Sequence, residues 1–271
     1  MIPRLYPKVS YRGRFAPSPT GSLHQGSLVA ALGSFLHARK AGGEWLLRIE
    51  DIDPPREVLG AKDEIIFALE AYGLTWDRDI LYQSTRVQEY EKLLIHISNY
   101  TCACSRQKIK MQGHHIRESC TPGKAIRFLN QVPVYDFTDL FLGPIKIAED
   151  LAQEDFLLKR SDGYFAYQLA VVLDDLAQGM THIIRGEDLL LATGWQLSLI
   201  NSLCESAPLY GHLPLVLDKR GVKLSKQNHA KPVNYTDPLL IRQNLISALS
   251  RLGYHPPDLS HNELLNWAIM T

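Results

Sequence analysis

Two short runs of residues carry groups that could act on a phosphate. In the first, Pro17-Ser18-Pro19 and Thr20-Gly21-Ser22 are followed by His24 and Gly26. The prolines remove backbone donors and end a strand, and a helical pattern begins soon afterwards. A tight turn before a helix N-terminus presents free backbone amides to an anion. We therefore expect a phosphate site at which His24 donates and Gly26 lets the ligand approach the backbone.

The second run is Lys223-Leu224-Ser225-Lys226, in a loop after the apolar segment Leu213–Leu217, which we expect to be a strand. Two lysines about a serine are usually a solvated loop. Ammonium groups also stabilise the negative charge that develops on phosphoryl oxygens during phosphoryl transfer. The run lies about 200 residues after His24, so the fold must bring the two together.

Alternating strands and helices are predicted to position these runs. Apolar residues from Leu28 to Leu36 recur with helical spacing, and Trp45–Glu50 forms an apolar strand pattern. Helices are predicted around Ile65 and over Arg86–Asn99. This alternation indicates an α/β fold with a parallel sheet, and ligands bind at the carboxyl ends of such strands.

Composition indicates an ordinary globular chain. The 271 residues are 45% hydrophobic and 21% charged, with 29 Lys+Arg and 29 Asp+Glu. A nucleic-acid partner would therefore need a local basic patch rather than the net charge. No apolar run approaches the ~20 residues that span a bilayer, and the first residues lack the apolar core of a signal peptide. We expect a cytoplasmic protein without a membrane partner.

Three of the four cysteines crowd into one region, as Cys102-x-Cys104 and Cys120. This spacing is a zinc pattern that lacks one ligand. His115 or His114 could supply it, and we favour His115. The site would then hold one structural zinc per chain, and the alternative is three reduced cysteines. The fourth cysteine, Cys204, follows an apolar helix pattern and is expected to be buried.

The run from Arg14 to Ser27 resembles the first signature of class I aminoacyl-tRNA synthetases, in the form that glutamyl enzymes use. Ser27 departs from the histidine usual at the last position. Residues 223–226 resemble the second signature, with Leu224 in place of methionine. The resemblance implies Mg-ATP as a substrate. It implies catalytic roles for His24 and Lys226, and ATP contacts from His24, Gly26, Lys223, Ser225 and Lys226.

Three more segments resemble the glutamyl enzymes: Arg48–Asp53, Tyr167–Asp175 and Thr181–Asp188. The resemblance implies L-glutamate as the amino acid, bound by Arg14, Ser18, Glu50, Tyr167 and Arg185. Arginine forks suit carboxylates, and Glu50 would pair with the ammonium group. Glutamate is favoured over glutamine because a neutral amide would leave buried guanidinium groups uncompensated, which typically costs several kcal/mol. In small relatives a tyrosine can be the fourth zinc ligand, and Ile116 occupies that position here.

The resemblance implies a class I Rossmann-type parallel sheet with an inserted small α+β subdomain and a short helical C-terminal segment. We divide the chain into four parts. Residues 1–99 and 161–217 would form the catalytic domain, and 100–160 the zinc-containing subdomain that binds tRNA. Residues 218–271 would hold the ATP loop and the tail.

About 45 residues follow Lys226, too few for the anticodon-binding region of a full glutamyl enzyme. This matches the glutamyl-queuosine branch of the family, which attaches glutamate to queuosine in the anticodon loop of tRNA(Asp). We expect a monomeric ligase that forms glutamyl-adenylate without tRNA and then transfers glutamate to the cyclopentene diol of queuosine. The alternative within the class is a minimal glutamyl-tRNA synthetase that charges the tRNA 3′ end. A silent RNA-binding paralogue and a metabolic nucleotidyltransferase are alternatives of other classes.

Overall fold

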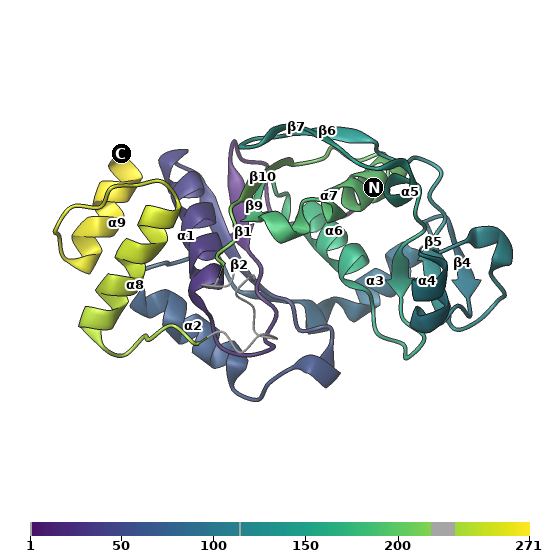
Figure 1. Cartoon of the computed structure of the whole chain (residues 1–271), viewed down its shortest axis with the longest axis horizontal. Coiled ribbons are helices and arrows are strands. Elements are labelled where there is room, and N and C mark those ends of the chain that lie inside the picture. Colours follow the sequence, from purple (N-terminus) through teal and green to yellow (C-terminus); the bar gives the residue numbers. More distant parts are fainter. Residues whose placement is uncertain (1, 114, 218–230) are drawn as a thin grey trace. The chain divides into compact units, whose positions relative to one another are not determined.

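The computed structural model describes residues 2–113, 115–217 and 231–271, which form two compact units (Figure 1). The parallel-sheet unit comprises residues 9–82, 181–188 and the described part of 211–271. The antiparallel-sheet unit comprises residues 2–8, the described part of 83–180, and 189–210. The four-part division expected from the sequence stays a prediction.

The parallel-sheet unit is built on three parallel strands in the order β1-β2-β3. These are β1 (Arg12–Phe15), β2 (Glu44–Ile49) and β3 (Leu81–Tyr82). Strand β9 (His182–Gly186) lies beside β1 and pairs with β10 (Leu209–Leu213). The Thr181 amide donates to the Arg12 carbonyl at 3.0 Å, which joins the starts of β9 and β1. The parallel sheet predicted from the alternation of elements is confirmed.

Helix α1 (Gln25–Lys40) forms the core of this unit. Leu28, Leu32, Phe35 and Leu36 are all buried, and the Trp45 indole donates to the Ser34 hydroxyl at 3.0 Å. The C-terminal helices α8 (Pro238–Arg251) and α9 (His261–Met270) pack against α1 (Figure 1). The unit also contains η1 (Pro54–Arg56) and α2 (Ala61–Ala71).

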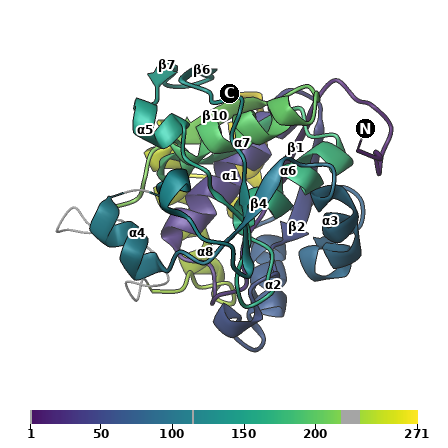
Figure 2. The same ribbon diagram turned by 90° about the vertical axis from the view of Figure 1, so that its right-hand side faces the viewer.

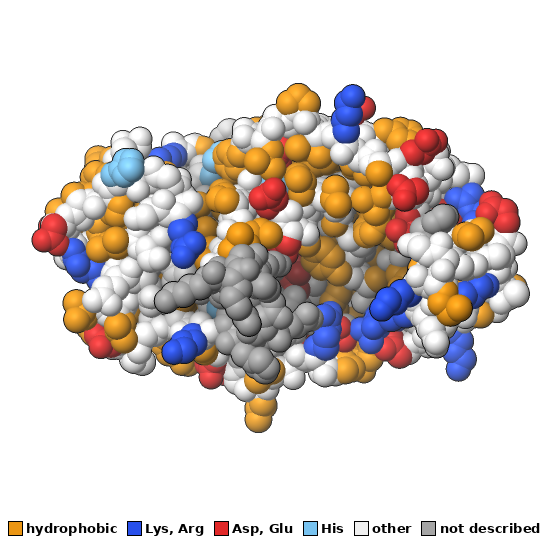
Figure 3. All heavy atoms as spheres, viewed as in Figure 1, with side chains coloured by type: hydrophobic (Ala, Val, Ile, Leu, Met, Phe, Trp, Pro, Cys, Tyr) orange, Lys and Arg blue, Asp and Glu red, His pale blue; other side chains and the backbone are white. Residues whose placement is uncertain are grey.

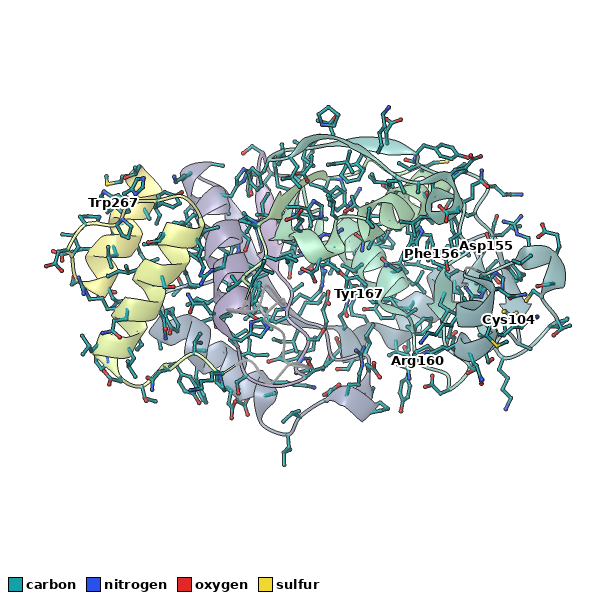
Figure 4. All side chains as sticks on the ribbon, in the orientation of Figure 1. Cys104, Asp155, Phe156, Arg160, Tyr167 and Trp267 are labelled. Carbon is teal, nitrogen blue, oxygen red and sulfur yellow. The ribbon has the colours of Figure 1, made fainter. Side chains whose placement is uncertain are left out.

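Local capping explains where the two C-terminal helices begin. Asp237 accepts hydrogen bonds from the amides of Leu239 and Leu240, and Pro238 occupies the first turn of α8. Ser260 and Glu263 form the capping box that their spacing predicts. Trp267 projects from α9 and makes an edge contact with Tyr254 (Figure 4). The tail is therefore helical, as expected.

The antiparallel-sheet unit contains a three-stranded sheet in the order β4-β5-β8 and a two-stranded hairpin. The sheet is formed by β4 (Asn99–Cys102), β5 (Ala125–Phe128) and β8 (Leu157–Lys159). The hairpin is formed by β6 (Asp136–Asp139) and β7 (Gly143–Lys146), with α5 (Glu149–Ala152) next to it (Figure 2). The remaining elements are η2 (Gln83–Arg86), α3 (Val87–Leu94), α4 (Arg106–Gln112), η3 (Arg117–Ser119), α6 (Tyr167–Gln178), η4 (Glu187–Leu189, shared between the units) and α7 (Ala192–Ser202).

Three local predictions are wrong. The strand expected at Leu213–Leu217 is β10, which ends at Leu213, and the helix expected to reach Asn99 ends at Leu94. Cys204 is exposed rather than buried. The reason is that α7 ends at Ser202 and the chain turns at Cys204, whose φ of 54° is left-handed.

Candidate active site and metal centre

His24 is the N-cap of α1, so it stands where the first signature passes from the loop into the helix. Its Nδ1 accepts from the Ser27 amide at 3.2 Å, and the Ser27 hydroxyl lies 3.2 Å from Nε2. An accepting Nδ1 puts the ring proton on Nε2. The cap therefore sets the tautomer that can donate from Nε2 to a phosphate oxygen. Gly26 lies in the first turn of α1, two residues after His24.

Glu50 lies at the carboxyl end of β2 and is buried. Its amide donates to the Pro17 carbonyl at 3.0 Å, and the Val58 amide donates to the Pro19 carbonyl at 2.9 Å. These bonds join the loop after β1 to the loop after β2. The first signature and Glu50 therefore meet at one edge of the parallel sheet, where open α/β sheets bind ligands.

The Glu50 carboxylate faces the Arg48 guanidinium, with Nη2 3.4 Å from Oε1, and both side chains are buried. Asp51 next to it accepts from Lys62 at 2.7 Å, and Asp53 pairs with Arg56. A buried carboxylate needs such compensation to stay ionised. The acidic run after β2 is thus a set of ion pairs rather than a solvated loop cluster.

Arg14 and Arg185 come from the neighbouring strands β1 and β9, and each is only 4% exposed. Arg185 donates from Nε to Nε2 of His212 on β10, at 3.2 Å. Both guanidinium groups are therefore buried on adjacent strands of this unit. Guanidinium forks of this kind suit carboxylates.

The other predicted site residues differ in their placement. Ser18 is exposed in the loop between its two prolines, and Tyr167 is the first residue of α6, in the antiparallel-sheet unit. Arg14, Ser18, His24, Gly26, Glu50 and Arg185 all belong to the parallel-sheet unit. Lys223, Ser225 and Lys226 lie outside the described residues, as does His114.

The metal centre gathers the four predicted side chains. The ligand atoms of Cys102, Cys104, His115 and Cys120 all lie within 4.8 Å of one another. Cys102 is the last residue of β4, and its sulfur accepts from the Cys104 amide at 3.3 Å. A Cys3His set with ligand atoms this close suits tetrahedral zinc. The cluster is therefore compatible with a structural zinc site.

His115 is oriented by groups on the side away from the sulfurs. Its Nδ1 lies 3.4 Å from the Tyr100 hydroxyl, and its Nε2 lies 3.4 Å from the Cys102 sulfur. The Tyr100 hydroxyl donates to the Asp155 carboxylate at 2.7 Å, so it can accept from His115. A proton on Nδ1 leaves the lone pair of Nε2 for a metal, as outer partners of metal-binding histidines do.

Electrostatics favour the protonation state that a metal requires at His115 and Cys102, whereas burial and the neighbouring thiols raise the pKa of Cys120 to about 12. Burial, and then the charge of Arg127, lower the pKa of His115 below its ordinary value, so the imidazole is neutral at pH 7. Burial alone raises the pKa of the Cys102 thiol. Hydrogen bonds from Cys120, the Cys104 amide and Arg127 nevertheless bring its pKa below the ordinary value. Both shifts favour ligand formation.

Three supporting residues escaped the sequence analysis: Arg48, His212 and Tyr100. Arg48 could have been found, because a charge inside the apolar run of β2, two positions before Glu50, must share its face of the sheet. His212 and Tyr100 act on residues far away in the sequence, and no local pattern marks them.

Residues 10–127 and 122–267 match the family described as tRNA synthetases class I (E and Q), catalytic domain. The chain belongs to this family. A Glutamyl-Q tRNA(Asp) synthetase of Shewanella oneidensis is 51% identical over 257 residues, covering 91% of this chain and 85% of that protein. A protein of the same name from Vibrio vulnificus is 46% identical over 273 residues, covering 96% and 89%.

Among solved structures, glutamate-tRNA synthetase from Elizabethkingia anophelis superimposes on this class I chain with a TM-score of 0.78 at 26% identity. The match covers 94% of this chain and 65% of that one. The class I synthetase fold expected from the two signatures is therefore confirmed. Within residues 2–113, 115–217 and 231–271, no helix has the length and apolar character to cross a membrane.

Proposed function

We propose that the protein activates L-glutamate with Mg-ATP and transfers the glutamyl group to queuosine in tRNA(Asp). The observation that carries the amino acid choice is the pair Arg14 and Arg185, buried on neighbouring strands. The names of the relatives in Shewanella and Vibrio carry the choice of acceptor. In this proposal Arg14 and Arg185 bind the side-chain carboxylate, with Ser18 and Tyr167 contributing hydroxyl groups. Glu50 binds the ammonium group.

The first step forms glutamyl-adenylate. An α-carboxylate oxygen of glutamate attacks the α-phosphorus of ATP, the bond to the bridging oxygen breaks, and pyrophosphate leaves with the electron pair. No general base is needed, because the carboxylate is already ionised at pH 7. The work of the protein is to position the reactants and stabilise charge. His24 donates from Nε2 to a phosphate oxygen, beside the amides at Gly26. Lys223, Ser225 and Lys226 contact ATP, and Lys226 stabilises the leaving pyrophosphate.

The second step transfers glutamate. A hydroxyl oxygen of the queuosine cyclopentene diol attacks the carbonyl carbon of the adenylate. The carbon–oxygen bond to AMP breaks, and the hydroxyl proton is released. Neighbouring hydroxyls of the diol resemble those of a terminal ribose, so a site built for the ribose needs little change. We propose that adenylate formation precedes tRNA binding, and that the protein acts as a monomer.

The Cys3His cluster has a structural part in this proposal. Cys102, Cys104, His115 and Cys120 would hold one zinc ion, which supplies a cross-link between the end of β4 and the segment before β5. The orientation of His115 by Tyr100 supports this assignment. Zinc takes no step in the chemistry.

The acceptor is tested with tRNA(Asp) that carries or lacks queuosine. Labelled glutamate should transfer only to the queuosine form, and transfer should survive removal of the 3′ terminal adenosine. Periodate, which cleaves vicinal diols, should abolish transfer when the trimmed tRNA is treated beforehand. Efficient charging of unmodified tRNA(Glu) at its 3′ end would establish the minimal glutamyl-tRNA synthetase instead.

A further inference from the structure

The residues on either side of His24 take part in a closed ring of hydrogen bonds within the parallel-sheet unit. On one side, the Leu23 carbonyl accepts from the Val233 amide at 2.8 Å. On the other side, Nε2 of Gln25, the first residue of α1, donates to the Asn244 carbonyl on α8 at 3.1 Å. Both contacts lead from the first signature to the C-terminal part of the same unit.

Tyr72, the C-cap of α2, closes the ring. Its hydroxyl donates to the Asn234 carbonyl at 2.7 Å and accepts from Nδ2 of Asn244 at 2.9 Å. The Tyr72 side chain is fully buried. Burial raises its pKa above the ordinary value, although the hydrogen bond from Asn244 opposes this, so the hydroxyl keeps its proton and remains a donor at neutral pH. One hydroxyl group therefore joins α8 to the segment that precedes it.

That segment is held at both of its ends. Asn234 accepts through Oδ1 from the amides of Thr236 and Asp237, at 2.9 Å and 2.7 Å, and this turn leads directly into α8. Pro232, a few positions after the second signature, forms a β-bridge with His24. The chain that follows the second signature is therefore fastened to the histidine of the first.

We propose that this ring is a clamp that positions the His24 imidazole for adenylate formation, with Gln25 and Tyr72 as its positioning residues. Neither residue has to touch glutamate or ATP, because each acts on the backbone beside His24. A displacement of reacting groups by about 1 Å can cost on the order of 100-fold in rate, and bonds on both sides of His24 restrict such a displacement. This inference rests on the proposed function and adds positioning residues to it.

The surface of this part of the unit does not mark the clamp. Over α8 and α9 it mixes apolar, acidic and basic side chains rather than forming a patch of one charge (Figure 3). The clamp is defined by hydrogen bonds alone, so its test must remove single hydrogen-bonding groups.

Two variants open the ring at opposite points and are assayed by ATP–pyrophosphate exchange with glutamate. Tyr72→Phe removes only the hydroxyl, and Gln25→Met removes the side-chain donor at similar volume. We expect each to lower kcat about tenfold while KM for glutamate changes less than about twofold, because the proposed glutamate ligands lie outside the ring. Tyr11→Phe is the matched control. It removes a buried hydroxyl of the same unit, 2.6 Å from Nδ1 of His37, and should cost stability without changing kcat.

Two further measurements separate positioning from a general loss of stability. Because both changes open one ring, the double variant Tyr72→Phe/Gln25→Met should lose little more kcat than either single variant. The Val233 amide should exchange its hydrogen faster in Tyr72→Phe, but not in Tyr11→Phe. Normal kcat in both single variants, or unchanged protection of Val233, would overturn the clamp. Lack of exchange activity in the wild type would refute the proposed function instead, and the Val233 amide would still report on the ring.

Discussion

Arg185 on β9 donates a hydrogen bond from Nε to Nε2 of His212 on β10, at 3.2 Å. The acceptor must be an imidazole nitrogen that carries no proton. His212 itself is 1% exposed. His212 thus fixes the plane of the Arg185 guanidinium, which we propose binds the glutamate side chain. His212 itself is not proposed to contact the substrate.

Replacing His212 should affect glutamate binding rather than the rate of adenylate formation. Loss of one hydrogen bond of this kind is worth about 1 kcal/mol, so His212→Ala should raise KM for glutamate about fivefold to tenfold. KM for ATP and kcat should change little. His212→Gln keeps an acceptor and should recover part of the loss. A fall in kcat with unchanged KM for glutamate would contradict the positioning role.

Replacing Arg185 itself should be far more severe. Removing one partner of a charged, buried recognition pair costs about 2–4 kcal/mol, which corresponds to roughly 30-fold to 900-fold in kcat/KM. ATP–pyrophosphate exchange with glutamate, measured without tRNA, is the assay. Arg78→Gln is the control, because Arg78 pairs with Glu44 outside the proposed site. Normal exchange by Arg185→Gln would refute the assignment, and exchange in the wild type only after tRNA is added would refute activation without tRNA.

The metal centre predicts about one zinc per chain by elemental analysis. Cys120→Ser and His115→Ala should each lower the zinc content and the unfolding temperature, because zinc binding contributes to folding free energy. His115→Cys retains a ligand and should keep more zinc than His115→Ala. Cys204→Ser is the control, because that thiol is exposed and outside the cluster. Unchanged zinc content in Cys120→Ser would show that the cluster is not the site.

Two histidines should make stability fall in mild acid. Burial lowers the pKa of both His37 and His182 below the ordinary value of 6.5. The charge of Lys40 lowers the pKa of His37 further, and the charge of His37 lowers that of His182 further. The Tyr11 hydroxyl lies 2.6 Å from Nδ1 of His37, and the Tyr11 ring stacks on His182. The unfolded chain therefore binds more protons than the folded chain below about pH 6.5.

The contribution of these two histidines to the unfolding temperature should accordingly be constant above that pH. It should decrease as the pH falls toward their folded pKa values. The double variant His37→Gln/His182→Gln should lose much of this slope, whereas His255→Gln, at an exposed position, should keep it. An unaltered slope in the double variant would assign the acid sensitivity to other groups.

The sequence was informative where a pattern is local. The turn before α1, the end of β2 and the capping box of α9 could all be predicted, because each depends on residues within a few positions. The Cys3His cluster was also predicted, since its spacing and a nearby histidine restrict the choice of ligands. Ser105, which caps α4 by accepting from the Lys108 amide, belongs to the same class of local signals.

What the sequence did not reveal depends on contacts between distant segments. The bond from Arg185 to His212 requires β9 and β10 to pair, and Tyr100 meets Asp155 across 55 positions. The exposure of Cys204 depends on a left-handed turn that an apolar helix pattern does not predict. Such features follow from tertiary packing, which overrides local preference.

The division of the parallel-sheet unit among three stretches of chain has a consequence for its synthesis. Helix α1 is made early, whereas α8 and α9, which cover it, follow about 200 residues later. The apolar face of α1 that α8 and α9 cover therefore stays exposed until these two helices have been synthesised. Most of the antiparallel-sheet unit is contiguous and can fold during that interval. The nascent chain should accordingly depend on chaperones until its last helices emerge.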